Sequence, residues 1–221
     1  LGQSEVMPIL SKVETPARQC KPNALGKLFD DMEVKLLRDD GQEAGPGEVG
    51  EFTIRPLLPH VIFSGYFDDP EATRRAFHGD WYGSGDLGVK DAEGDFYFVD
   101  RKKDYIRYKG RNISSLQVES VAASHPAVAA AAVYGVPSET LESEHEIKLD
   151  AILRPGHSLS CEELARHINE HAPYFCVPRY IEFVSELPYT PTQKLEKYKL
   201  RAKGISAATW DRLTSDFELQ R

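Results

Sequence analysis

The feature that most constrains the fold is a change of pattern near residues 101–104. In residues 28–100, short runs of alternating apolar and polar residues are separated by glycine-rich turns, which is typical of antiparallel strands. Beyond this point, helical and strand-like patterns follow one another in the order β-α-β-β-α-β. The chain is therefore predicted to be α+β: a mostly antiparallel, barrel-like β subdomain, then a small α+β domain with two helices on one face of a sheet.

Capping residues indicate where two helices begin. Asp68 or Asp69 stands before Pro70, so an N-cap followed by proline at the first helical position predicts a short helix within residues 68–78. Ser160 and Glu163 form the Ser-x-x-Glu pattern of a capping box, which predicts the start of a later helix.

Composition excludes some classes of function. The 221 residues carry a formal net charge of -8 and no block of basic residues, so we expect no nucleic-acid partner. The longest apolar run, residues 127–136, is too short to cross a bilayer, so no membrane span is expected. Neither an initiator methionine nor a basic leader is present at the start, and we interpret the chain as a fragment of a cytoplasmic protein.

The cysteines and histidines do not form a recognisable site. Cys20, Cys161 and Cys176 are widely spaced and lack a C-x-x-C pair, which predicts reduced thiols and neither a disulfide framework nor a zinc site. His167 and His171 are four residues apart and could share a helix face. Without a third ligand, we interpret them as ordinary helix residues.

Four segments carry the residues with chemical potential. They are LGQSE (1–5), WYGSGDL (81–87), FVDRKKDYIRYKGRNIS (98–114) and LPYTPTQKLEKYKLR (187–201). In this order and spacing they resemble the later motifs of the adenylate-forming superfamily, which includes acyl-CoA synthetases, luciferase-like enzymes and nonribosomal adenylation domains. Within that superfamily, the chain looks most like the carnitine/crotonobetaine-CoA ligase-like enzymes.

The resemblance implies a domain organisation and a reaction. Residues 1–101 would be the end of a large adenylation domain, and residues 102–221 a mobile C-terminal domain. Such enzymes activate a small carboxylate with ATP to an acyl-adenylate, release pyrophosphate, and pass the acyl group to CoA. The remainder of the protein's own N-terminal domain is then a necessary partner.

The resemblance identifies Lys194 as the catalytic residue. Phosphoryl chemistry brings several negative charges together, and a lysine can place a compact positive charge beside them. The family usually has glycine where this chain has Gln193, and Pro191 would help to fix the loop. Read without the resemblance, Lys194 is a solvated surface lysine.

Further residues are implied to bind the nucleotide. The Asp86 carboxylate matches the two ribose hydroxyls, and Arg101 can also reach ribose oxygens. Gln3 and Ser4 would lie near the adenylate, and Glu5 would help to hold Mg²⁺, an ion that prefers oxygen ligands. The simpler alternatives are an Asp86 that caps a turn, an Arg101 that pairs with a neighbouring aspartate, and an exposed Glu5.

Two residues are implied to serve the second half-reaction. Lys103 would be the hinge about which the C-terminal domain rotates, because Lys194 must leave before the pantetheine arm can enter. Gly110 would lie against the CoA tunnel, where the lack of a side chain permits close approach. An ordinary linker lysine and a hairpin glycine are the alternatives.

The family's Gly/Ser/Thr-rich phosphate loop is absent from this sequence. We therefore predict that these 221 residues alone have negligible ligase activity. Two other functions stay open: an adenylation domain that loads a carrier protein, and a non-catalytic interaction module with the same fold.

Overall fold

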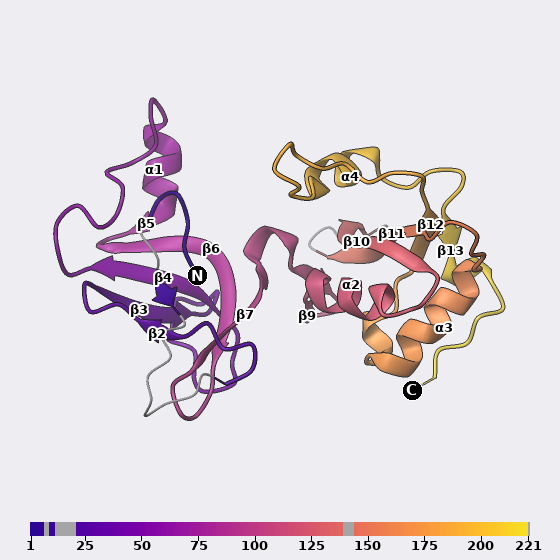
Figure 1. The fold of residues 1–221 in the computed structure, drawn as a ribbon, viewed down its shortest axis with the longest axis horizontal. Helices are drawn as coiled ribbons and strands as arrows, with labels where there is room; N and C mark the ends of the chain where they lie inside the picture. Colours follow the sequence, from indigo (N-terminus) through magenta and orange to yellow (C-terminus); the bar gives the residue numbers. More distant parts are fainter. Residues whose placement is uncertain (7–8, 12–20, 139–143, 221) are drawn as a thin grey trace. The chain divides into compact units, whose positions relative to one another are not determined.

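The computed structural model describes residues 1–6, 9–11, 21–138 and 144–220 (Figure 1). The chain divides into two compact units, the N-terminal unit Leu1–Lys103 and the C-terminal unit Asp104–Arg221. Cys20 lies outside the described residues, and so its predicted state has no structural counterpart. Cys161 and Cys176 are free thiols, as predicted.

The N-terminal unit is built on a five-stranded antiparallel sheet. Its strand order is β3-β4-β6-β5, with β7 paired to β6. Two short strands, β1 and β2, form a separate pair. The strands are β1 (Leu10–Ser11), β2 (Lys27–Leu28), β3 (Met32–Leu37), β4 (Gly50–Pro56), β5 (Phe77–His78), β6 (Trp81–Lys90) and β7 (Phe96–Arg101).

One short helix, α1 (Pro70–Ala76), precedes β5. The side chain of Asp69 accepts a hydrogen bond from the N–H of Ala72, so of the two predicted N-caps it is Asp69 that caps the helix. The core of this unit is apolar, and its largest fully buried side chains include Phe52, Ile54 and Leu36 on β3 and β4. The sheet is therefore held by a packed face, as the alternating pattern predicts.

The C-terminal unit contains a four-stranded mixed sheet of order β10-β11-β12-β13. The β11–β12 pair is parallel, and the two outer pairs are antiparallel. A hairpin of β8 and β9 precedes the sheet. The strands are β8 (Ile106–Tyr108), β9 (Arg111–Ile113), β10 (Val128–Pro137), β11 (His145–Leu153), β12 (Tyr180–Phe183) and β13 (Trp210–Asp211).

Helices cover both faces of this sheet. On one side α2 (Ser115–Ala123) and α3 (Cys161–His171) pack over a core that includes Val133, Leu149 and Ile181, which confirms two helices on one face (Figure 1). On the other side α4 (Lys197–Lys203) packs through Leu200 against Tyr134 (Figure 1). The described residues also contain three short 3-10 turns: η1 (Lys102–Asp104), η2 (Tyr174–Cys176) and η3 (Arg212–Thr214).

The predicted capping box is present at α3. Ser160 accepts from the N–H of Glu163, and the Glu163 carboxylate accepts from the N–H of Ser160. These hydrogen bonds lower the pKa of Glu163. No helix among the described residues is both long and apolar enough to cross a membrane.

Candidate functional site

A bulge in strand β6 sets up the site of the N-terminal unit. Glu51 pairs with Leu87 and Thr53 pairs with Gly83, so Ser84, Gly85 and Asp86 together stand opposite the single residue between Glu51 and Thr53. Bulges bend a strand and redirect its side chains. The structure places Asp86 inside the ten-residue strand β6, at this bulge.

Asp86 is almost completely buried, with a side chain that is 2% exposed. Its Oδ2 accepts a hydrogen bond from Gln3 Nε2 at 2.7 Å, and its backbone N–H donates to Ser84 Oγ at 3.1 Å. Arg101, directly opposite on β7, brings its Nε to 2.8 Å from Oδ1. The geometry of that pair is not that of a hydrogen bond, and among the described residues Oδ1 has no hydrogen-bond donor.

Gln3 ties the start of the chain to this strand. Its Nε2 also donates to the carbonyl oxygen of Ser84 at 2.9 Å, and its Oε1 accepts from the hydroxyl of Tyr82 at 2.9 Å. All three partners require the same orientation of the amide, so the side chain is fixed by the network. Gln3, Asp86 and Arg101, which the resemblance implies to bind the nucleotide, are thus brought together.

Glu5 and two tyrosines lie beside this network. The Tyr66 hydroxyl donates to Glu5 Oε1 at 3.1 Å. Burial, followed by the negative charge of Glu5, raises the pKa of the Tyr82 hydroxyl, which therefore stays protonated at neutral pH. Ser4 is exposed. Sequence reasoning gave Tyr82 no role. Tyr82, Ser84 and Asp86 are alternate positions of β6 and all three are buried. The two-residue period of a strand could therefore have predicted that Tyr82 lies on the same face as Asp86.

The arrangement fits a nucleotide sugar and a hard cation. A buried carboxylate oxygen that is ion-paired with a half-exposed Arg101, but not hydrogen-bonded in the described chain, suits a ligand hydroxyl that can donate to it. No group of three or more His, Cys, Asp or Glu side chains that could hold a metal occurs within the described part of the chain. Glu5 offers one carboxylate, which suits Mg²⁺ because that ion takes one or two carboxylates together with substrate phosphates and water.

Lys194 lies on an exposed hairpin loop of the C-terminal unit. Tyr189 and Leu195 form an isolated antiparallel bridge, and the N–H of Thr190 donates to the carbonyl oxygen of Lys194 at 2.8 Å. Between them Pro191 sits in the turn, and Gln193 has a φ of 61°. Three-residue hairpin loops place a left-handed residue at this point, where glycine is preferred. The family's usual glycine therefore has a backbone reason, and Gln193 is held in a left-handed conformation.

Gly110 occupies the turn between β8 and β9. Lys109 and Gly110 have φ values of 48° and 72°, and positive φ at both central residues is the type I′ pattern that favours glycine at the second position. Their backbone N–H groups donate to the carboxylate of Glu144 at 2.6 and 2.7 Å. The hairpin alone accounts for the glycine, and its contact with CoA stays a prediction.

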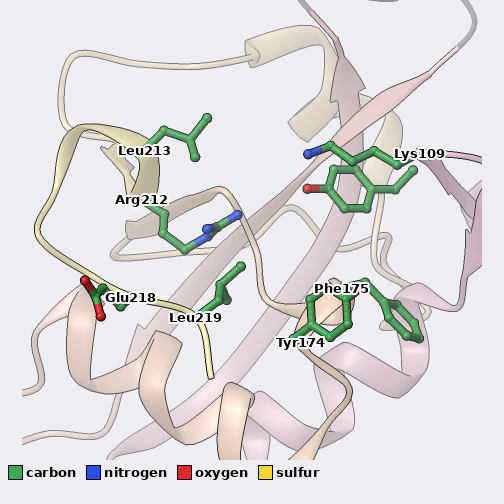
Figure 2. A pocket seen from close by; sticks show the side chains of 8 residues that line it. Lys109, Tyr174, Phe175, Arg212, Leu213, Glu218 and Leu219 are labelled. Atoms are coloured by element: carbon green, nitrogen blue, oxygen red, sulfur yellow. The ribbon is translucent and has the colours of Figure 1, made fainter. Parts of the chain in front are cut away.

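A pocket of about 490 Å³ reaches this hairpin (Figure 2). Figure 2 shows the side chains of Lys109 and Arg212 extending toward the middle of the pocket, with the rings of Tyr174 and Phe175 together at one side. The remaining lining residues are Tyr108, Leu213, Glu218 and Leu219. The pocket therefore combines aromatic surface with positive charge, a combination that suits a flat, anionic ligand.

The predicted site residues divide between the units. Gln3, Ser4, Glu5, Asp86 and Arg101 belong to the N-terminal unit, and Lys194 and Gly110 belong to the C-terminal unit. Lys103 lies in the exposed η1 turn, at the last position of the N-terminal unit. That Lys194 approaches Asp86 stays a prediction.

The fold and these motifs match those of adenylate-forming enzymes. Residues 117–194 match the sequence model of the AMP-binding enzyme C-terminal domain. The chain is 35% identical over 207 residues to the human mitochondrial acyl-coenzyme A synthetase ACSM4, covering 90% of this chain and 35% of that protein. The chain thus spans about a third of the length of its curated relatives.

Similar solved structures also belong to adenylate-forming ligases. The amide bond synthetase McbA from Marinactinospora thermotolerans superimposes with a TM-score of 0.70 at 34% identity, over 82% of this chain and 36% of that one. The o-succinylbenzoate coenzyme A synthetase MenE from Bacillus subtilis, in complex with ATP and magnesium, gives 0.69 at 32% identity, over 83% and 36%. The homologues of this chain are acyl-CoA synthetases and other adenylate-forming ligases.

Proposed function

We propose that the full-length protein that carries this chain is an AMP-forming acyl-CoA synthetase. It activates a carboxylate with ATP, releases pyrophosphate, and transfers the acyl group from the adenylate to the thiol of CoA. The observation that carries the proposal is the Asp86 site, where Gln3 and Arg101 meet one buried carboxylate, in a protein whose homologues are acyl-CoA synthetases.

The N-terminal unit holds the nucleotide. Asp86 accepts from the ribose hydroxyls, and Arg101, whose side chain is 50% exposed, turns from Asp86 toward the ribose oxygens. Gln3 and Ser4 line the adenylate, and Glu5 would hold Mg²⁺, which neutralises phosphate charge when it is bound. Residues 1–101 are then the end of a larger adenylation domain.

The C-terminal domain, residues 102–221, supplies the catalytic charge. Lys194 covers the α-phosphate while the carboxylate attacks, and stabilises the negative charge that develops there. Rotation about Lys103 then removes Lys194 and opens the way to CoA. The exposed loop that carries Lys194 supports this role, because an exposed lysine can be presented to a ligand without breaking a packed core.

CoA binding is assigned to the β8–β9 hairpin and its neighbouring pocket. Gly110 borders the pantetheine arm, and the pocket beside Lys109 takes the flat, phosphate-bearing end of the molecule. The aromatic and cationic lining supports this assignment.

A lysine pair in one segment tests the proposal. In the full-length enzyme, Lys194→Ala should lower ATP–pyrophosphate exchange about 100- to 1,000-fold, the usual loss when one group that stabilises a transition state is removed. Lys199→Ala is the matched control, since Lys199 is a 52% exposed lysine that pairs with Glu196, and it should leave exchange within about twofold. No exchange by the wild-type enzyme would favour a non-catalytic module, and equal, measurable rates for wild type and Lys194→Ala would remove Lys194 from the catalytic role. The 221-residue chain alone should show no exchange.

We also propose candidates for the carboxylate substrate, for the acceptor of the acyl group and for the cellular location of the protein. Resemblance favours a carnitine/crotonobetaine-like carboxylate, and similarity to MenE adds o-succinylbenzoate to a substrate panel. The likeness to an amide bond synthetase favours adding an amine as acyl acceptor beside CoA, and a carrier protein is the third acceptor to test. A cytoplasmic location stays a prediction, since a close relative is mitochondrial.

A further inference from the structure

Glu51 lies outside every motif discussed above, yet its carboxylate contacts two separate parts of the N-terminal unit. The residue is on β4, and its side chain is only 13% exposed. Its Oε1 accepts a hydrogen bond from the backbone N–H of Gly85 at 2.9 Å. Its Oε2 lies 2.7 Å from Lys102 Nζ.

The first contact stabilises the bulge next to Asp86. Because the bulge places three residues of β6 opposite one residue of β4, the regular ladder is interrupted there. Glu51 supplies an acceptor to the Gly85 N–H within this interruption. Gly83 leaves room for that carboxylate, since a Cβ at this position would lie 2.9 Å from Glu51 Oε1.

The second contact fixes the chain just beyond Arg101. Lys102 opens the η1 turn and directly follows the arginine that pairs with Asp86. Burial lowers the pKa of Lys102, but the carboxylates of Glu51 and Asp39 outweigh burial and raise the pKa above its ordinary value. Lys102 is therefore charged at neutral pH, and the pair with Glu51 persists.

We propose that Glu51 is a positioning residue that couples the Ser84–Asp86 bulge to the chain at Lys102, and so couples the nucleotide site to the predicted hinge at Lys103. Its two carboxylate oxygens serve the two sides separately. The consequence for catalysis rests on the proposed function, whereas the coupling itself can be measured in this chain without any activity.

Amide hydrogen exchange at Gly85, measured by NMR on the 221-residue chain, tests the coupling. Glu51→Ala should speed exchange of the Gly85 N–H about tenfold, the factor that corresponds to losing about 1.4 kcal/mol of hydrogen bonding. Glu51→Gln keeps an acceptor oxygen and should change it less than about threefold. Lys102→Met should speed exchange of the Gly85 N–H about threefold. In the double variant Glu51→Ala/Lys102→Met, exchange should be no faster than in Glu51→Ala, because both substitutions act through the Glu51 side chain.

Two results would overturn the coupling: Gly85 exchange that is unchanged in Glu51→Ala, or effects of the two substitutions that simply add. In the full-length enzyme, Glu51→Ala should raise the KM for ATP about tenfold, and Glu51→Gln should restore it to within about twofold. Lys102→Met should raise this KM by less than Glu51→Ala does, about threefold, and should also alter the ratio of thioester formation to adenylation.

Asp86→Ala distinguishes a failure of the positioning role of Glu51 from a failure of the proposed nucleotide site. If Asp86→Ala raises the KM for ATP and Glu51→Ala does not, the positioning role is wrong. If neither variant alters it, the assignment of Asp86 to the nucleotide fails, and Gly85 exchange still decides whether Glu51 couples the bulge to Lys102.

Discussion

A buried lysine in the C-terminal unit leads to a sharp prediction about stability. Lys148 on β11 is fully buried, and its Nζ lies 2.8 Å from Glu182 Oε2, 3.1 Å from Asp150 Oδ1 and 3.0 Å from the carbonyl oxygen of Gly204. Lys148→Met removes one positive charge and leaves two buried carboxylates facing an apolar side chain. Breaking a buried ion pair from one side costs about 3–5 kcal/mol.

The structure favours the lower end of that range. Glu182 keeps Lys203 at 2.9 Å and Thr209 at 2.7 Å, and Asp150 keeps the Tyr134 hydroxyl at 2.8 Å. We therefore expect a loss of about 3 kcal/mol, a large share of the 5–15 kcal/mol that stabilises a typical domain. In urea this corresponds to a fall of about 1.5 M in the unfolding midpoint for a slope of about 2 kcal/mol/M.

The assay is urea unfolding followed by the fluorescence of Trp210, in a Trp81→Phe background so that only the C-terminal unit is observed. Lys203→Met is the matched control, because Lys203 contacts the same carboxylate but its side chain is 48% exposed. That change should cost less than about 1 kcal/mol. Equal losses for the two variants would refute the argument that burial decides the cost.

The pH dependence gives a second check on the same network. Burial raises the pKa of Glu182, but hydrogen bonds from Lys148, Thr209 and Lys203 outweigh burial and lower it to about 2, against an ordinary value of 4.5. A lowered folded-state pKa contributes stability that is complete above pH 4.5 and is lost as pH falls toward 2, about 3 kcal/mol in all. In Lys148→Met the pKa of Glu182 rises, so the difference in stability between wild type and variant should shrink as the pH falls from about 4.5 toward 2. A difference that stays constant would exclude this account.

Three further substitutions test local backbone arguments by thermal unfolding. Gln193→Gly removes a side chain from a left-handed position and should stabilise the chain by about 0.5 kcal/mol. The steric gain is partly offset because glycine makes the unfolded chain more flexible. A clear loss of stability would show that Gln193 makes a compensating contact. Ser160→Ala removes the cap of α3 and should cost about 1 kcal/mol, whereas Ser160→Thr should not. Gly110→Ala meets open space but keeps a φ of 72°, so it should cost about 1 kcal/mol from backbone strain alone; no loss at all would contradict the turn assignment.

Much of the fold could be predicted from local pattern. The caps at Asp69 and Ser160 and the alternation in β4 and β11 place most elements, because these signals depend on neighbouring residues only. The helix α4 was not predicted, since its seven residues are mostly charged and only Leu200 is buried.

Strand β6 shows that a glycine-rich segment can form a strand where its sequence suggests a turn. Its segment WYGSGDLG suggests a turn, yet it forms the longest strand of the N-terminal sheet. Two of its glycines are there for close packing: a Cβ at Gly88 would lie 2.3 Å from the ring of Phe52, and one at Gly83 would lie 2.9 Å from Glu51. Glycine in a strand signals close approach as well as turning, and sequence alone does not tell the two apart.

The site itself depends on contacts that no local pattern contains. Gln3 and Asp86 are 83 residues apart in sequence, and their hydrogen bond fixes which oxygen of the carboxylate is occupied. The resemblance predicted both residues but neither this contact nor the support from Tyr82 and Glu51. Motif matching therefore finds the groups that touch a ligand more easily than the groups that hold them in place.

The burial of Asp86 and the exposure of Arg101 together suggest how a nucleotide could be exchanged. Under the proposed function Arg101 moves away from a carboxylate that is 2% exposed, and leaving that carboxylate unpaired would be costly. Because the arginine is half exposed, water can solvate its guanidinium when it moves away, so the cost of separating the pair falls mainly on the buried Asp86. In the proposed complex, a ribose hydroxyl that donates to Oδ1 would offset part of that cost. We therefore expect ATP binding to fall sharply with loss of the Asp86 carboxylate, and to fall less with Arg101→Lys, which keeps the positive charge but loses the fork of donors.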